Sequence, residues 1–314
     1  MIIAFSDSST IMILKNQTKL VAVMNIQYLI LIPMIGLAVA KVLLQGMISR
    51  TYLKNPTDSA LYNAIVFSGM SVLYLVFSGF RLPSLHILPY GALYGLMLAG
   101  FQIFFTLALQ RGPVSHTTLI INFNILFSVY YGITYCGETL SVYNIIGLVC
   151  MFLSLVLTID FKQAKQHKFD ILWFILALTA TTCNGLSSIV LKIQKVRFPA
   201  EDMGMLLSAY ISGALALGLA VLFFTYVRKQ PKMVVMHPSR VSVMLCSSLI
   251  MGAHLVLFSK GAGIIPAVVF FPIANIAPAT VISLFGIFVF KDNLTKQQVF
   301  SMIFGICATL LLCF

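Results

Sequence analysis

Two short stretches, CGETLS at residues 136–141 and FKDNLT at residues 290–295, share a pattern that decides the fold. In each stretch an acidic residue, Glu138 or Asp292, is followed by leucine at the second position and by serine or threonine at the third. A glycine stands six residues before each acid. Because the chain has only 8 acidic residues, the recurrence of this setting indicates an internal repeat.

The hydroxyl residues of the two stretches predict helix starts. Ser141 and Thr295 are residue types that favour the N-cap position, and Asn144 and Gln298 stand three residues further on, where a capping box needs an amide or carboxylate. Each stretch therefore predicts the end of one helix and the start of the next, with the acid near the positive end of a helix dipole.

The composition predicts that most of the chain lies in lipid. It is 60% apolar and 9% charged, whereas soluble domains are about a quarter charged. The excess of 20 Lys and Arg over 8 acids falls mostly between apolar runs, a pattern typical of loops facing anionic headgroups. Basic residues interleaved with aromatic residues, as nucleic-acid binding requires, are absent from the sequence, so we expect no nucleic-acid partner.

Apolar runs long enough to cross a bilayer predict ten transmembrane segments. Each segment is expected to be an α-helix, because unpaired backbone amides are costly in hydrocarbon. The fold class is therefore an all-α integral membrane protein with ten transmembrane helices. The expected spans are 26–48, 59–79, 87–109, 116–136, 142–159, 171–193, 204–227, 241–259, 265–290 and 297–314.

A second correspondence supports two halves of five helices each. IGLAVAKVLLQG in the first span resembles NGLSSIVLKIQK in the sixth, with Gly36 matching Gly185 and Gln45 matching Gln194. Since five is odd, the second half must enter the membrane in the opposite direction, which makes an inverted repeat of the kind many transporters use. The expected division is an N-terminal extension 1–25, a first repeat 26–160, a polar linker 161–170 and a second repeat 171–314.

These residues resemble the EamA branch of the drug/metabolite transporter superfamily. The resemblance rests on the ten spans, on the acid-x-Leu-Ser/Thr ending of each fourth span and on Gly185 with Lys192 in the sixth span. In the first span Lys41 comes two residues earlier than Lys192 would predict. The resemblance implies a secondary transporter, independent of ATP, in the bacterial inner membrane. It would export a small metabolite, an amino acid-like compound or a drug.

The titratable residues inside the spans are few. The sequence places no carboxylate at the centre of a span, and the first span holds no acid, unlike the small multidrug transporters of this superfamily. His254 is the mid-span titratable candidate, for proton relay or substrate binding, or else for a helix–helix hydrogen bond. Lys41 either snorkels to the membrane surface or faces a cavity and attracts an anion, whereas we expect Lys192 to snorkel.

Uncharged polar residues complete a candidate binding pocket between the first, third, fourth, sixth, eighth and ninth spans. Amides inside membrane helices also join helices to one another, so each residue alone favours packing. The predicted substrate-binding residues are Lys41, Gln102, Asn122, Asn124, Asn184, His254 and Asn275. The predicted cavity walls are Tyr130, Tyr131, Phe270 and Phe271.

Other function classes are disfavoured by the motifs that the sequence lacks. It contains no metalloprotease, serine-hydrolase or phosphate-loop motif, so we expect no enzyme activity, no cofactor and no metal. The 6 cysteines lie in or beside apolar runs and are typical of packing residues. A membrane-embedded interaction or scaffold protein without transport activity is the alternative function, and a homodimer is an open alternative to a monomer.

The orientation in the membrane has two conflicting indications. The loops after the odd-numbered spans hold most of the Lys and Arg that lie outside the spans. The positive-inside rule therefore places both termini outside the cytoplasm, whereas the resemblance implies cytoplasmic termini.

Overall fold

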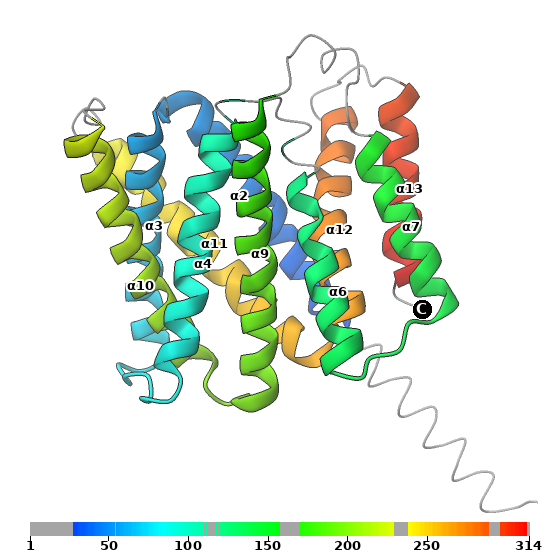
Figure 1. Ribbon diagram of the computed structural model, residues 1–314, viewed down its shortest axis with the longest axis horizontal. Helices are drawn as coiled ribbons and strands as arrows, with labels where there is room; N and C mark the ends of the chain where they lie inside the picture. The colour runs from blue at the N-terminus through cyan, green and yellow to red at the C-terminus, as the bar shows by residue number, and fades with distance from the viewer. Residues whose placement is uncertain are drawn as a thin grey trace, which may run out of the picture.

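The computed structural model is helical throughout the part of the chain that it describes, with no strand there (Figure 1). The described residues are 28–53, 55–109, 111, 117, 120–157, 170–228, 238–288 and 296–312. The helices are α2 (Leu31–Tyr52), α3 (Pro56–Phe77), α4 (Leu88–Leu109), α6 (Asn124–Tyr135), α7 (Val142–Leu157), α9 (Ile171–Arg197), α10 (Asp202–Leu222), α11 (Pro238–Ile264), α12 (Ala267–Phe288) and α13 (Lys296–Leu312). A short π-helix, η1 (Phe223–Val227), continues α10.

These ten helices confirm the all-helical fold that the apolar runs predict. Five of them are long and apolar enough to cross a membrane by length and composition: α3, α4, α9, α10 with η1, and α11. Shorter apolar segments lie in α2, α7, α12 and α13. Together they define an integral, multi-pass membrane protein.

One predicted span contains a break. The expected span 116–136 is interrupted at Phe123, between the helical residues 120–122 and α6. The main chain there makes short-range bonds, from the amide of Phe123 to the carbonyl of Ile120 (3.1 Å) and from the amide of Leu126 to that of Phe123 (3.0 Å). Such three-residue spacing tightens the backbone beside a cavity-facing residue, Asn124, a position that an apolar run alone does not reveal.

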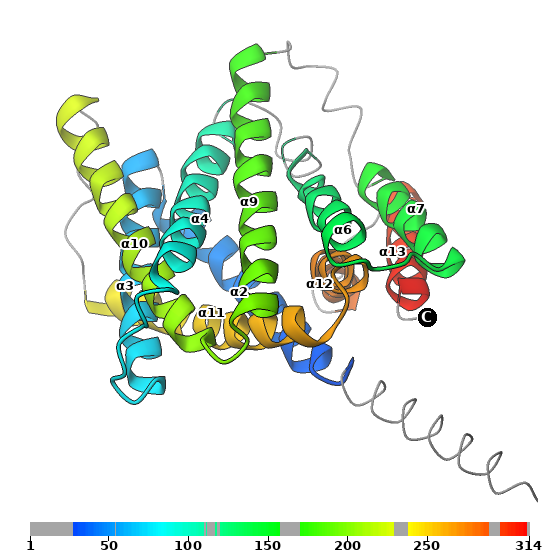
Figure 2. The same cartoon turned by 60° about the horizontal axis from the view of Figure 1, so that its bottom comes forward.

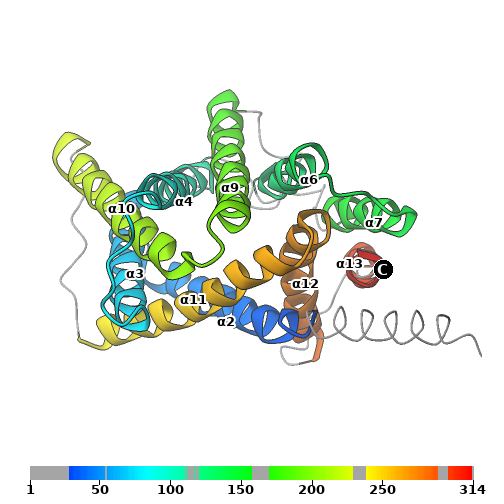
Figure 3. The same ribbon diagram turned by 90° about the horizontal axis from the view of Figure 1, so that it is seen from below.

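The helices form a flattened bundle in which segments from both halves of the chain alternate. Seen from below, α3, α4 and α10 lie at one end, while α6, α12, α7 and α13 lie at the other (Figure 3). Between them α2 and α11 run side by side along one edge, with α9 opposite (Figures 2 and 3). The largest helix contacts join α10 with α3 and α4, α4 with α9, and α7 with α13.

The outward faces of the bundle are apolar. Leu215 and Leu219 of α10 are each 66% exposed, and Val72 of α3 is 61% exposed. In water such a surface would be costly, but in a bilayer the surrounding lipid tails are equally apolar. The exposed leucines and valines are therefore the lipid-facing surface of the protein.

Two glycines bring α4 and α10 into close contact. A Cβ added at Gly95 would lie 2.7 Å from the carbonyl carbon of Ala209, and one at Gly91 would lie 2.8 Å from the Met205 oxygen. Backbone atoms cannot move aside as a flexible side chain can. This crossing therefore depends on small residues, as close membrane-helix contacts generally do.

We predict that Gly95→Ala lowers the free energy of unfolding by about 1–3 kcal/mol, because the added methyl overpacks the crossing. Thermal unfolding of the purified protein in nanodiscs measures the loss. Gly218→Ala is the matched control in α10, since nothing lies within 4 Å of a Cβ there. Equal stability of the two variants would contradict the close crossing.

Candidate functional site

A cavity of about 410 Å³ lies in the middle of the bundle. Its lining comes from α2, α3, α4, α9, α10, α11 and α12, together with Asn124 at the start of α6 and Ile121 just before it. Volumes of roughly 300–1,000 Å³ are usual for sites that bind small molecules. Both halves of the chain contribute, so the cavity exists only when they are packed together.

The cavity gathers most of the polar residues that the sequence singles out. Six of the seven predicted binding residues line it: Lys41, Gln102, Asn124, Asn184, His254 and Asn275. They come from six different helices, the same six that the sequence assigns to a pocket. Asn122 is not among the lining residues.

Of the four predicted wall residues, the structure brings Phe271 to the cavity and leaves the other three away from its lining. Phe270 is fully buried and packs edge-on against Phe271, with ring centroids 5.3 Å apart. Tyr131 stacks on Tyr135 at 5.2 Å. Tyr130 is 62% exposed and points away from the core.

Lys41 faces the cavity, which decides between the two alternatives that the sequence leaves open. Its helix continues to Tyr52, about three turns further, so the membrane surface is too far for its side chain to reach. Lys41 and His254 both line the cavity, from α2 and α11, two helices that pack on each other. The site therefore has a cationic corner between α2 and α11.

The amides of the cavity differ in what they already bind. The Asn275 amide nitrogen donates to the carbonyl of Phe271 (2.7 Å), which occupies one of its groups within α12. The side-chain oxygen of Asn124 is buried and has no hydrogen-bond partner. A buried polar atom without a partner is costly, so a rotation of the Asn124 side chain that brings this oxygen to a donor in the cavity would be favourable.

Sequence reasoning misses the aromatic part of the lining. Phe67 of α3 and Tyr210 of α10 face the cavity and meet edge to face, with ring centroids 4.7 Å apart. Tyr94 of α4 and Phe258 of α11 line it as well. With 25 Phe and 12 Tyr in the chain, no sequence signal distinguishes these rings from packing residues.

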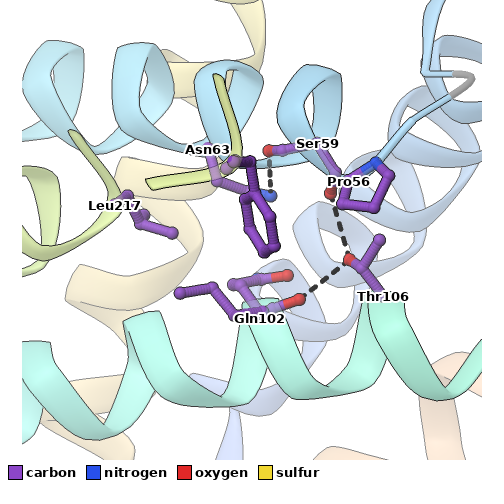
Figure 4. Close-up of a pocket in the computed structure, with 9 residues that line it drawn as sticks. Pro56, Ser59, Asn63, Gln102, Thr106 and Leu217 are labelled. Carbon is purple, nitrogen blue, oxygen red and sulfur yellow. Dashed lines mark hydrogen bonds between the residues drawn. The ribbon is translucent and has the colours of Figure 1, made fainter. Parts of the chain in front are cut away.

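A second, much smaller pocket of about 10 Å³ adjoins the cavity through Gln102, which lines both (Figure 4). The Ser59 hydroxyl meets that of Thr106 (3.0 Å), and Thr106 donates to the Gln102 carbonyl (2.8 Å). The Asn63 amide donates to the Ser59 carbonyl (2.9 Å). The space suffices for about one water molecule, so polar groups continue from the cavity towards the start of α3.

An ion pair lies at the lower end of the bundle in Figure 1, where α6 joins α7. The Glu138 carboxylate accepts hydrogen bonds from the amides of Ala267 (2.9 Å) and Val268 (3.0 Å), at the start of α12. The Lys192 ammonium lies 3.3 Å from the same carboxylate. It also donates to the carbonyls of Ala262 (3.3 Å) and Ile265 (3.2 Å), at the end of α11. We call these six residues the junction network.

The junction network corrects two expectations. Lys192 does not snorkel: it is 8% exposed, because Glu138 and two carbonyls hold it inside the bundle. Glu138 lies at a positive helix end as predicted, but the helix is α12 of the other half, not the adjoining α7. Gly132 makes room for it, since a Cβ there would lie 3.2 Å from the carboxyl carbon.

The start of α7 has the predicted capping box. The Ser141 hydroxyl accepts from the amide of Asn144 (3.1 Å), and the Asn144 side chain accepts from the amide of Ser141 (3.1 Å). The corresponding residues of the second stretch, Asp292 and Thr295, lie outside the described residues.

The network lies about one helical turn from the cavity. Ser188, which lines the cavity, precedes Lys192 by one turn of α9, and Phe271 follows Ala267 by one turn of α12. On the lower side of the cavity, four helical segments are thus tied together by charge-assisted hydrogen bonds. In the residues that the structure describes, no group of three or more His, Cys, Asp or Glu could hold a metal ion.

The comparisons with known proteins agree with the fold and the class. Residues 24–160 match the EamA-like transporter family. A solved crystal structure of another protein is 14% identical; the alignment covers 91% of this chain and 96% of that one, with a TM-score of 0.71. At that identity the likeness shows the fold alone. No curated protein matches this sequence.

The class of the protein follows from the helices and from this family match together: it is a multi-pass membrane protein of the transporter type. More particularly, residues 24–160 are similar to the EamA-like family, which is part of the drug/metabolite transporter superfamily.

Proposed function

We propose that the protein is a secondary transporter, which moves a small metabolite, amino acid-like compound or drug by alternating access around the central cavity. The observation that carries the proposal is the convergence of six polar side chains, from six helices of both halves, on one cavity of about 410 Å³. In a scaffold without transport activity, we would not expect these polar residues to line one shared cavity. They would serve separate helix contacts.

Two inverted halves, residues 26–160 and 171–314, would allow two equivalent conformations, each with the cavity open to one side of the membrane. The helix contacts support this inference because they recur when the halves are exchanged. The third helix packs on the sixth (α4 on α9), and the eighth packs on the first (α11 on α2). In Figure 1, α2 runs upward and α9 downward, as opposite entry into the membrane requires.

The junction network would hold the lower side closed in the conformation described here. Its ion pair crosses from the first half, at Glu138, to the second half, at Lys192 and α12. Opening the cavity to the lower side would separate these partners. The family's substrates and membrane suggest an exporter in a bacterial inner membrane, although its direction depends on the substrate gradient.

The proposed function is tested by comparing metabolites outside cells that produce the wild type with those outside cells that produce Lys41→Ala or His254→Ala at matched membrane levels. We expect at least one metabolite to accumulate with the wild type and to fall to the level of non-producing cells with a variant. Equal profiles for producing and non-producing cells, in both export and uptake, would favour the scaffold alternative.

A further inference from the structure

Lys41 is a half-buried cation without a protein counter-charge among the described residues. It lines the cavity, yet no ion pair joins it to any described carboxylate. A charged side chain inside a membrane bundle normally pairs with an opposite charge or faces water. Since no described residue supplies the counter-charge, a bound molecule in the cavity could supply it.

The described acidic residues, which could supply a counter-charge to Lys41, all lie away from the cavity. Each of those in the described ranges stands at or beside a helix end and has its own polar partner. They are Asp58, Glu138, Asp170, Glu201 and Asp202, and none lines the cavity. Among the described residues that line the cavity, Lys41 is also the one Lys or Arg.

We propose that the transported molecule is an organic monoanion, a carboxylate with a flat apolar body and one hydrogen-bond donor. This inference rests on the proposed function and names the substrate class of its cavity. The carboxylate binds at the corner of Lys41 and His254, because one lysine balances one negative charge. A second negative charge would lie in the same cavity without a partner, at a high desolvation cost.

The remaining lining accounts for the rest of the molecule. The apolar body packs against the rings of Phe67, Tyr210 and Phe258, which line the cavity on the α3, α10 and α11 sides. Aromatic faces and edges favour a flat ring over a flexible chain. The donor reaches the unpartnered oxygen of Asn124 on the α6 side.

The experiment measures binding to the full-length protein in nanodiscs by the shift of its thermal unfolding midpoint. The probes are indole-3-propionate, its primary amide and the corresponding indolylpropylamine, which share one body and differ in charge. A fourth probe, 3-(1-naphthyl)propionate, lacks the indole N–H. Sodium chloride replaces the probes in a separate arm, since chloride is an alternative counter-ion.

We expect indole-3-propionate to raise the unfolding midpoint more than the amide and the amine do. Lys41→Gln should weaken its binding about ten- to a hundredfold, as expected when a charge-assisted hydrogen bond is lost. Lys41→Arg should retain most of it. Lys260→Gln is the matched control, because Lys260 is exposed and does not line the cavity. The naphthyl probe should bind more weakly, and Asn124→Leu should remove that difference.

Equal binding of the amine or amide, or indole-3-propionate binding that survives Lys41→Gln, would overturn the substrate class. Stabilisation by chloride to which the carboxylate adds nothing would overturn it as well. These outcomes leave the transporter in place if metabolite accumulation still depends on the protein. Conversely, Lys41-dependent carboxylate binding without any transport would keep the anion site and contradict the proposed function.

Discussion

Glu138→Ala is expected to be the most damaging single substitution in the junction network. It leaves the buried Lys192 ammonium without its counter-charge and removes the acceptor of two amides at the start of α12. Breaking a buried ion pair from one side costs about 3–5 kcal/mol. We therefore expect a large fall in the thermal unfolding midpoint in nanodiscs, together with increased exposure of the lower end of the bundle.

A double-mutant cycle separates the ion pair from ordinary packing. Lys192→Met should cost less than Glu138→Ala, because Glu138 keeps its two amide bonds. Combining Lys192→Met with Glu138→Gln removes both charges, and the pair should be more stable than the sum of the single losses predicts. Additive losses would mean that the two side chains do not interact in the membrane.

Ala279→Trp is expected to abolish transport while leaving the protein folded. Ala279 lines the cavity from α12 and is exposed to it, so an indole ring at this position projects into the space proposed for the substrate. Export of the metabolite identified with the wild type should fall to the level of non-producing cells. Thermal unfolding should show a midpoint close to that of the wild type, since the ring fills existing space.

Leu215→Trp is the control for this prediction. Leu215 is 66% exposed on the lipid-facing side of α10, where an indole ring meets only the bilayer. Its transport should match that of the wild type. Unchanged export by Ala279→Trp, at matched membrane levels, would place the substrate path outside the central cavity.

The fold was largely predictable because a segment that crosses lipid must be a long apolar helix. Long apolar runs can be recognised in a single sequence. The spans expected at 87–109 and 171–193 correspond to α4 and α9, the latter extended to Arg197. The break at Phe123 was not predictable, since a tightened turn leaves the apolar run uninterrupted. The local pattern of apolar residues thus predicts that a helix exists better than it predicts whether the helix is unbroken.

The candidate site was predictable where polarity stands out against an apolar background. Lys41, Gln102 and His254 are conspicuous inside their spans, and they meet in the cavity. Phe67 and Tyr210 were not predictable, since aromatic residues are common in every span. The sequence also does not reveal the partner of a charged residue. Lys192 was expected to snorkel, whereas in the fold it forms an ion pair with Glu138.

The central claim is that one cavity opens alternately to the two sides of the membrane. The most direct measurement is the reaction of Ala279→Cys, in a variant with the 6 native cysteines replaced, with an impermeant thiol reagent added to either side of sealed vesicles. We expect labelling from one side to dominate at rest, and we expect Glu138→Gln to raise labelling from the opposite side, because it loosens the junction network. Labelling from the same single side under every condition would contradict alternating access. These conditions include the Glu138→Gln variant and the presence of transported substrate.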